Sequence, residues 1–425
     1  MLTDARAGCS AVELNAETLQ QFQAEVVRAI EEEQHQQRLH HSAAWRDWVK
    51  SAGASSPGWV HRWTALRQPW RPLKASGGAS GRPIDMLKSE SSRLERLWQC
   101  TDEETAFCED TDSSWRALPT VAPEEVLAAA RTFSYKTAQT WDGFHPRHFA
   151  LLTLEQAHIV GMLYRLMERT GVTPTVIRSV VTKLIPKHRA GVEQLSMRGI
   201  GLMAALYRHW QRLRQPVARA WEREHREAML AHQAGRSVME TVFVQALRSE
   251  AACTKNADGQ QMFSAAFLWD LANYFEFISH PKLWSRSGDQ QFPRCIMALS
   301  LNQYKSRRFV GLSGLTVEST FPSRGISAGC GWATTYVQIY SLDPLRQWKL
   351  QFERVPLSMF IDDLKASAEE DTESKVVTTL TEAGAALKVA IQEDLECQVA
   401  SHKSILIAST DSLLHKLRRA FGQHA

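Results

Sequence analysis

Apolar residues recur along the chain with characteristic spacings, and these spacings predict the first elements of structure. From residue 11 to 50 they fall three and four positions apart, which is typical of an amphipathic helix. Residues 51–88 instead carry Gly, Ser and Pro clusters around several tryptophans, so we interpret them as irregular or linker-like. Six acids and no base between residues 101 and 115 indicate a domain boundary.

Further along, the pattern becomes more regular. Pro123 and two acids open a predicted helix, because proline and negative charge both suit a helix N-terminus. A turn is expected at residues 142–143, with another helix after it. A β-branched stretch predicts a strand that ends at Pro186, and residues 201–233 have a strongly helical composition. Residues 265–278 begin as a strand and turn into a helix.

Two of the apolar runs end in an acid. One is Phe-Ile-Asp-Asp at residues 360–363, and the other ends at Asp270. A buried carboxylate without a partner is costly, so the adjacent pair Asp362 and Asp363 indicates either a sharp polar turn or a bound divalent metal. If the two runs pair in one sheet, Asp270 and Asp362 would meet at one edge. Such carboxylates hold hard cations such as Mg²⁺, and two such ions support phosphoryl transfer.

Composition adds one asymmetry to this picture. The 425 residues, 44% hydrophobic and 23% charged, are ordinary for a soluble globular protein and allow two or three domains. The net charge of +4 is small, but residues 165–227 hold thirteen Lys or Arg and five acids, a local net charge of +8. This excess fits a groove for a polyanion or, equally, a solvated helical face.

The number of cysteines and the first ten residues indicate the cellular compartment. Seven cysteines, an odd number without any C-x-x-C pair, indicate reduced thiols rather than a zinc site or a disulfide framework. The first ten residues contain an early acid and no apolar core, unlike a signal peptide. No apolar run reaches the length of a membrane span. We therefore expect an intracellular protein, nuclear or cytoplasmic, that is not secreted and has no membrane partner.

The order of the motifs resembles reverse transcriptases, most closely the polymerases of non-LTR retrotransposons. Residues 360–363 are similar to that family's aromatic-x-Asp-Asp hairpin, and residues 324–330 to its Gly-centred segment. Asp270, followed by Phe275 and Glu276, matches its first metal-binding segment. Further segments of residues 122–410 agree in order, at 140–148, 183–191, 196–214, 232–243 and 401–409.

The resemblance implies an α+β protein with the right-hand fold of reverse transcriptases. Fingers would occupy residues 121–265 and the palm 266–410, with an antiparallel sheet and helices packed on one face. Residues 1–120 would form a helical and partly irregular N-terminal extension. Residues 411–425 would be a C-terminal helix or the start of a thumb that is otherwise largely absent.

The resemblance also implies an activity. The chain would be an RNA-directed DNA polymerase, a nucleotidyltransferase that extends a primer 3′-hydroxyl with dNTPs by a two-metal mechanism. Asp270 and Asp362 would be the main ligands of two Mg²⁺ ions, which Mn²⁺ can replace, with Asp363 weaker. The Leu271 carbonyl would complete one metal shell. RNA template, DNA primer and dNTPs would be the partners.

Further residues would bind the nucleotide. By resemblance, Phe275 would exclude a ribose 2′-OH, although a core position is the ordinary alternative. Lys187 and Arg198 would clamp the triphosphate, or would simply be surface charges. Lys403 would lie near the pyrophosphate as a general acid.

The glycines and the basic stretch complete the expected site. Gly325 and Gly329 would let the chain pass close to template and nucleotide, because glycine has no side chain to clash. The helical part of the basic stretch would contact template phosphates. Its candidate residues are Arg208, Arg212, Arg214 and Arg219.

Departures from the family pattern keep other hypotheses open. Ala328 stands where most relatives carry Gln, Glu276 stands where they carry Asp, and the chain ends about twenty residues after Lys403. A catalytically decayed remnant that only binds RNA is therefore the main alternative. A host-adopted or telomerase-like reverse transcriptase ranks last. The sequence does not separate an active from an inactive copy, and it leaves the oligomeric state unknown.

Overall fold

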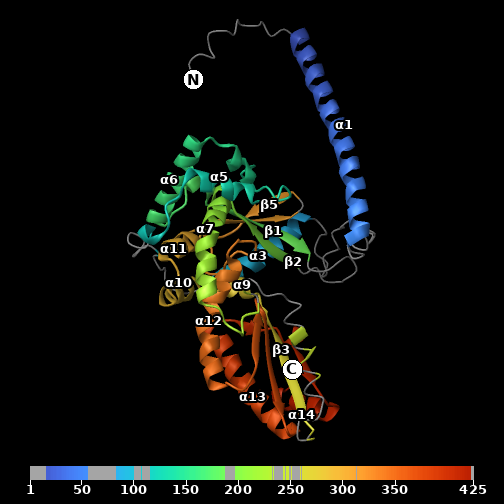
Figure 1. Cartoon of the computed structure of the whole chain (residues 1–425), viewed down its shortest axis with the longest axis vertical. Coiled ribbons are helices and arrows are strands. Elements are labelled where there is room, and N and C mark those ends of the chain that lie inside the picture. Colours follow the sequence, from blue (N-terminus) through green and yellow to red (C-terminus); the bar gives the residue numbers. More distant parts are fainter. Residues whose placement is uncertain are drawn as a thin grey trace. The chain divides into compact units, whose positions relative to one another are not determined.

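The computed structural model divides the chain into two compact units, residues 1–71 and 72–425. It describes residues 16–55, 83–99, 107, 115–186, 197–231, 233, 243–244, 246–247, 250, 259, 261–312 and 314–422. The first unit contributes α1 (Ala16–Ser55), which confirms the helix predicted there. All other described elements belong to the second unit (Figure 1).

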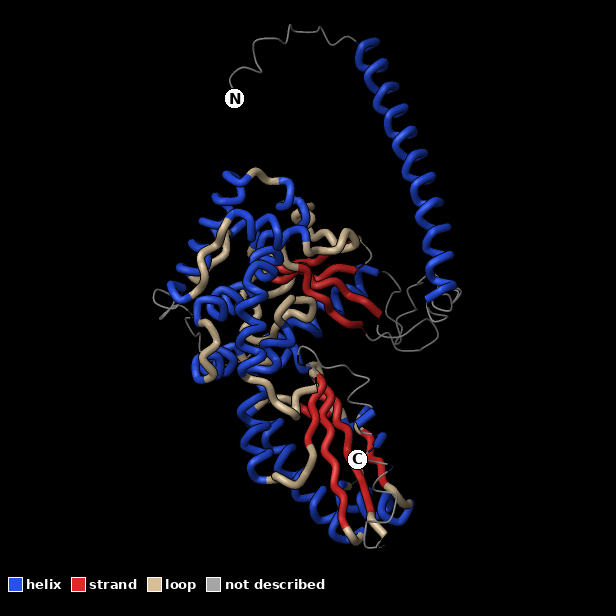
Figure 2. Tube along the Cα trace, in the orientation of Figure 1, coloured by secondary structure: helices blue, strands red, loops and turns tan. Residues whose placement is uncertain are grey.

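The helices of the second unit alternate with short strands. They are α3 (Pro83–Trp98), α5 (Pro123–Arg131), α6 (Leu154–Thr170), α7 (Ala205–Glu224), α9 (Tyr274–Phe277), α10 (His280–Asp289), α11 (Arg294–Tyr304), α12 (Ala333–Gln351), α13 (Glu373–Val389) and α14 (Asp411–Phe421). The strands are β1 (Val180–Pro186), β2 (Met197–Leu202), β3 (Phe263–Ala272), β4 (Arg308–Leu312), β5 (Leu315–Glu318), β6 (Leu357–Phe360), β7 (Asp363–Glu370), β8 (Gln398–Val399) and β9 (Ile405–Ala408). The chain is therefore mixed α/β, with two small sheets (Figure 2).

The first sheet has four strands in the order β2-β1-β4-β5, with β1 and β4 parallel and the other pairs antiparallel. Helix α3 packs on one face of it, where Leu87, Leu94 and Trp98 join Leu184 and Val310 in a small core. Residues 83–98 thus belong to the second unit. The expected N-terminal extension, 1–120, differs from the division at residue 71 that the structure shows.

The second sheet is antiparallel throughout. Its order is β6-β7-β3-β8, and β9 also pairs with β3. Helices α13 and α14 pack against it. Phe267 of β3 is fully buried there, with its ring 5.9 Å from that of Phe421 on α14. An antiparallel sheet with helices packed on it was predicted for this part of the chain, and so was a helix within 411–425.

Most predicted elements are confirmed, with one clear exception. The strand ending at Pro186 and the strand-to-helix change within 265–278 are both present. The prediction of one helix over residues 201–233 was wrong at both ends, because α7 covers only Ala205–Glu224. Beyond it, the carbonyl of Met229 and the N–H of Ala231 bond to the backbone of Met359 instead, at 2.7 and 2.8 Å.

Two further observations bear on the sequence analysis. Three of the described cysteines, Cys295, Cys330 and Cys397, are buried and unpaired. Among the described residues, no helix combines the length and the apolar character needed to cross a bilayer.

Candidate functional site

The register of the antiparallel sheet brings the two acidic runs together. Strands β3 and β7 pair residue by residue from Phe263 opposite Glu370 to Asp270 opposite Asp363. Just beyond, the Leu271 N–H donates to the Asp362 carbonyl at 2.9 Å. The prediction that the acid-terminated runs meet at one sheet edge is therefore confirmed.

A tight hairpin presents the middle acid. Phe360 of β6 pairs with Asp363 of β7, so only Ile361 and Asp362 form the turn. Ile361 has φ 60°, a left-handed conformation that disfavours β-branched residues and costs on the order of 1–2 kcal/mol. Backbone bonds from Met359 to Met229 and Ala231 hold the hairpin in place. Strain of this kind gathers at functional sites, where the surrounding structure enforces it.

The acids repel one another. Burial raises the pKa of Asp362, and the nearby Asp270 charge raises it further, whereas its own backbone N–H and the cations Arg198 and Lys403 oppose the shift. The pKa of Asp363 is also raised, first by burial and then by Asp362 and Asp270. Hard oxygen donors that destabilise each other's charge suit a divalent cation. Over the described ranges, however, no three His, Cys, Asp or Glu side chains come close enough together to form a metal-binding group.

Lys403 lies directly on the first acid. It ends a short 3₁₀ turn (Ser401–Lys403), and its ammonium stands 2.8 and 2.9 Å from the two carboxylate oxygens of Asp270. The Ala400 N–H also donates to the Asp270 carbonyl at 2.7 Å, which fixes the turn against β3. The Lys403 side chain is 49% exposed, so the pair contributes little to stability and the ammonium can exchange partners.

The Gly-centred segment packs on the chain that follows Asp270. The Gly325 N–H donates to the Ile278 carbonyl and the Ile326 N–H to the Phe275 carbonyl, both at 2.8 Å. Gly325 has φ +88°, and a Cβ there would stand only 2.8 Å from the Glu276 carbonyl oxygen. Phe275 itself is half-buried in α9.

The other end of the same segment reaches the four-stranded sheet. Gly329 has φ +106°, and a Cβ there would lie 2.8 Å from the Gly201 carbonyl oxygen of β2. The Gly201 N–H donates to the Ala328 carbonyl at 2.7 Å. Ala328 thus takes part through its backbone. The segment thus connects β2, which carries the exposed Arg198, to the chain that follows Asp270.

Two anchors of this segment were missed by sequence reasoning. His280 Nε2 and Arg308 Nη2 both donate to the Gly325 carbonyl, at 2.9 and 3.0 Å. Burial lowers the pKa of His280 to about 3 and that of Arg308 to about 10. The neutral imidazole must therefore carry its proton on Nε2. The Arg308 guanidinium also lies 4.3 Å from the centre of the Trp98 ring. Neither residue belongs to a motif, so the sequence contains no signal for them.

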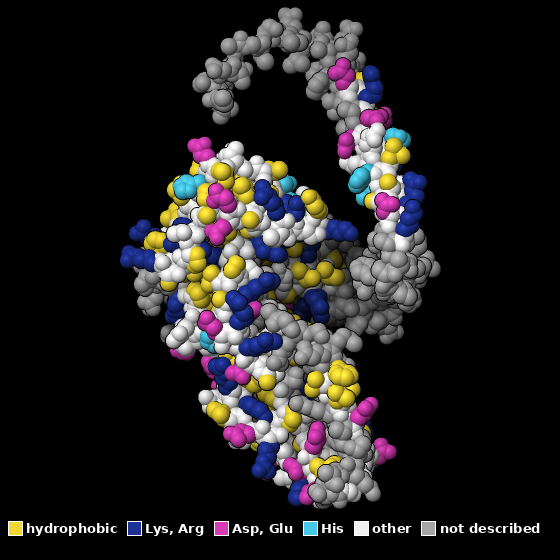
Figure 3. All heavy atoms as spheres, viewed as in Figure 1, with side chains coloured by type: hydrophobic (Ala, Val, Ile, Leu, Met, Phe, Trp, Pro, Cys, Tyr) yellow, Lys and Arg dark blue, Asp and Glu magenta, His cyan; other side chains and the backbone are white. Residues whose placement is uncertain are grey.

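One expected phosphate contact was wrong. Arg214 is buried and holds Glu168 with two bonds, from Nε at 2.6 Å and Nη2 at 2.8 Å. It faces inward because it shares the buried side of α7 with Trp210 and Ala218. Arg212 and Arg219 are exposed and Arg208 is half-buried, and Figure 3 shows several Lys and Arg side chains around α7.

Of the expected nucleotide ligands, Lys187 lies outside the described residues. Leu271 is buried in β3, directly after the first acid. The structure thus sets Asp270 opposite Asp363, with Asp362 in the adjoining turn and Lys403 on Asp270. Arg198 lies near enough to oppose the rise in the Asp362 pKa. No protein-family model matches the chain, and no curated protein matches it.

Proposed function

We propose that the chain is an RNA-directed DNA polymerase of a non-LTR retrotransposon-like element. One observation carries the proposal: Asp270 stands opposite Asp363 in a sheet, with Asp362 in the adjoining strained turn. A solvated polar turn needs neither a second acid-terminated strand in register nor a left-handed isoleucine. A site for divalent cations accounts for both features.

Asp270 and Asp362 would hold Mg²⁺, with Asp363 and the Leu271 carbonyl as further oxygen donors. Bound Mg²⁺ would lower the pKa of a primer 3′-hydroxyl and neutralise charge at the α-phosphate of a dNTP. The hydroxyl would lose its proton to water as its oxygen forms the new bond to that phosphorus, and pyrophosphate would leave with the electron pair of the broken P–O bond.

The surrounding residues would position the nucleotide. Arg198, exposed on β2, would attract the triphosphate electrostatically. Lys403 would exchange its contact with Asp270 for the leaving pyrophosphate. Phe275 would occupy the space of a ribose 2′-OH. His280 and Arg308 both donate to the Gly325 carbonyl, and this fixed segment would hold the Phe275 backbone through the adjacent Ile326 N–H.

Primer extension tests the proposal. The full chain is incubated with an oligo(dT) primer on poly(rA), dTTP, and Mg²⁺ or Mn²⁺. Asp362→Asn keeps the shape of the side chain but removes its charge, and we expect it to lower incorporation at least about 100-fold. Glu369→Gln is the matched control, because Glu369 is an exposed acid on β7, about 20 Å from Asp363 at 3.3 Å per residue. Absence of incorporation by the wild type with both metals would refute the proposal.

One observation favours a second candidate, a protein that binds RNA without catalysis. The Lys403 ammonium already contacts both oxygens of Asp270 and so competes with any cation. This candidate predicts RNA binding that weakens with salt and is unchanged in Asp362→Ala, with no extension by either form.

A further inference from the structure

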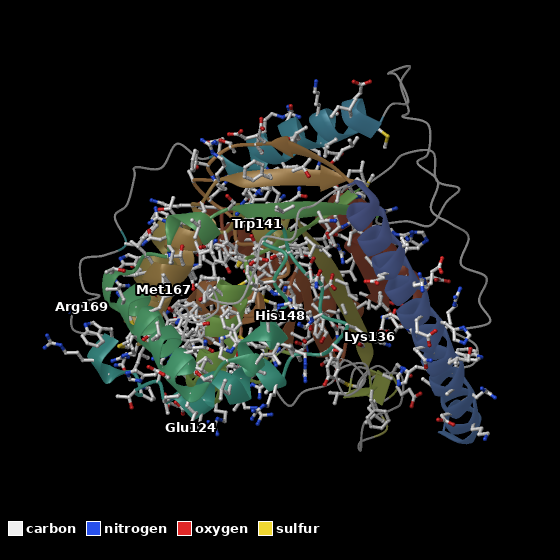
Figure 4. The ribbon with its side chains drawn as sticks, turned by 90° about the horizontal axis from the view of Figure 1, so that it is seen from above. Glu124, Lys136, Trp141, His148, Met167 and Arg169 are labelled. Carbon is white, nitrogen blue, oxygen red and sulfur yellow. The ribbon has the colours of Figure 1, made fainter. Side chains whose placement is uncertain are left out.

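The four-stranded sheet has two different faces. Helix α3 covers the face that carries Leu184 and Val310. On the other face, cross-strand register places Lys183 beside Gly311, and Val181 beside Phe309. Figure 4 shows Trp141, together with Lys136 and His148, on the side of the sheet away from α3.

A cavity of about 490 Å³ opens on that second face. We call it the Trp141 pocket. Its floor comes from β1, β2, β4 and β5, and its wall from residues 139–141 and Ser179. The lining residues used below are Trp141, Val181, Lys183, Phe309, Gly311 and Thr316. Because Gly311 contributes no side chain, the floor of the pocket is bare backbone at that position.

Trp141 is held in position beside this pocket. Its indole Nε1 donates to the Ser179 carbonyl at 3.2 Å, and the side chain remains 43% exposed. The next residue, Asp142, accepts a bond from the Ala205 N–H at the start of α7 at 2.7 Å, and others from Thr140 Oγ1 and the Phe144 N–H. A fixed aromatic ring loses little conformational entropy when a flat ligand stacks on it.

The chemistry of the surroundings identifies the ligand class. Lys183, on the floor, is exposed and offers one cation to a mainly apolar hollow. On either side of Trp141 the chain exposes two more aromatic rings, Tyr135 at 82% and Phe144 at 59%, beside the exposed base Lys136. The Arg147 guanidinium lies over the Tyr135 ring and bonds to the carbonyls of Arg131 and Phe133, so it supports this ring. Aromatic rings interleaved with cations bind single-stranded nucleic acid, because every base has a face that stacks and every linkage carries a charge.

The pocket shares its face of the sheet with a residue near the acids. Arg198 pairs with Ile185, which lies two residues along β1 from Lys183, or about 7 Å at 3.3 Å per residue. Ile185 is 46% exposed between them. A strand that leaves the acids past Arg198 can therefore follow the sheet to Lys183.

We propose that the Trp141 pocket binds one unpaired base of a single-stranded nucleic acid, stacked on Trp141 above Gly311, with an adjacent phosphate at Lys183. The polymerase proposal is needed only to name that strand as the template ahead of the acids. Base binding itself requires no catalysis, so the two proposals fail separately.

The test is binding of a labelled oligoadenylate of about ten nucleotides, the site size of such surfaces, measured by fluorescence anisotropy with the full chain. A strand of equal length with abasic residues keeps the phosphates and lacks the bases. No dNTP is present, so binding is separated from catalysis. We expect Trp141→Ala to weaken oligoadenylate binding roughly 5- to 150-fold, the range for losing one stacked base, and to leave abasic binding unchanged.

Two more variants address the floor of the pocket. A Cβ on Gly311 would find no atom closer than 3.5 Å, so Gly311→Val suits the strand while filling the pocket, and we expect a loss like that of Trp141→Ala. Lys183→Gln should reduce the slope of log affinity against log salt by about 0.7, because one phosphate contact is lost. The matched controls are Phe321→Ala and Lys375→Gln, which remove an exposed ring and an exposed cation outside the pocket.

The outcomes are exclusive. Selective losses in Trp141→Ala and Gly311→Val, with unchanged controls and unchanged thermal unfolding midpoints, support the base pocket. Equal affinity of wild type and both variants overturns it, as does equal binding of oligoadenylate and the abasic strand, or no binding by the wild type. A wild type that fails to extend primers but shows the selective losses would refute only the polymerase proposal.

Discussion

Replacing Gly325 by alanine isolates the contact between the Gly-centred segment and the chain that follows Asp270. The new Cβ would stand 2.8 Å from the Glu276 carbonyl oxygen and 3.1 Å from its Cα, both backbone atoms that cannot swing aside. Gly314 offers a matched comparison. Its φ of +85° nearly equals the +88° of Gly325, but a Cβ there meets nothing within 4 Å.

The magnitudes follow from these two environments. In both variants an alanine in the left-handed conformation destabilises the folded state by about 1–2 kcal/mol. Alanine also lowers the conformational entropy of the unfolded chain, which stabilises the protein by about 0.4–1 kcal/mol. Gly314→Ala should therefore lower the free energy of unfolding by at most about 1.6 kcal/mol. Gly325→Ala adds overpacking of about 1–3 kcal/mol, so the difference between the variants should be about 1–3 kcal/mol.

Urea unfolding followed by circular dichroism measures this difference from the shift in midpoint at a common slope. The same variants report on function, since displacement of Glu276 also moves Phe275. We expect Gly325→Ala to raise the KM for dNTPs in primer extension. Equal losses of stability in the two variants would refute the reasoning, because the close approach to Glu276 would then cost nothing.

Three more predictions follow from the site and its supports. Arg214→Leu leaves a buried carboxylate without its main partner and should lower the free energy of unfolding by about 3–5 kcal/mol, whereas the exposed Arg219→Leu should stay within about 0.5 kcal/mol in the same urea titration. His280 has a folded pKa of about 3, below its unfolded value of about 6.5, so the unfolded state binds more protons between these values. The free energy of unfolding should therefore fall as pH drops below 6.5, by about 1.4 kcal/mol at pH 5.5. If His280→Gln showed the same pH dependence as the wild type, another group would have to cause it. Lys403→Met removes the ion pair with the Asp270 carboxylate and should tighten Mn²⁺ binding by up to about fivefold. Electron paramagnetic resonance measures free and bound Mn²⁺, and weaker binding by the variant would show that the lysine assists the cation.

Local pattern predicted the parts of the site that lie within single segments. The apolar runs before Asp270 and before Asp362 form strands because their side chains are buried in a sheet, and the two acids follow where burial ends. The α7 arginines show the limit of such reasoning, because the sequence pattern of a basic helix does not indicate whether one of its guanidinium groups is buried. Only the buried Glu168 decides that Arg214 does.

The sequence by itself determined the two strands that lead to the acids, the helix that opens at Pro123 and where the acids stand along the chain. Tertiary structure alone decided the register that sets Asp270 opposite Asp363, and the two donors that His280 and Arg308 direct at one glycine carbonyl. It also decided that one face of the four-stranded sheet is covered by α3 while the other opens into a pocket. The reason is physical. Periodicity is a property of neighbours along the chain, whereas pairing, desolvation and charge repulsion depend on distances between segments that only the folded chain brings together.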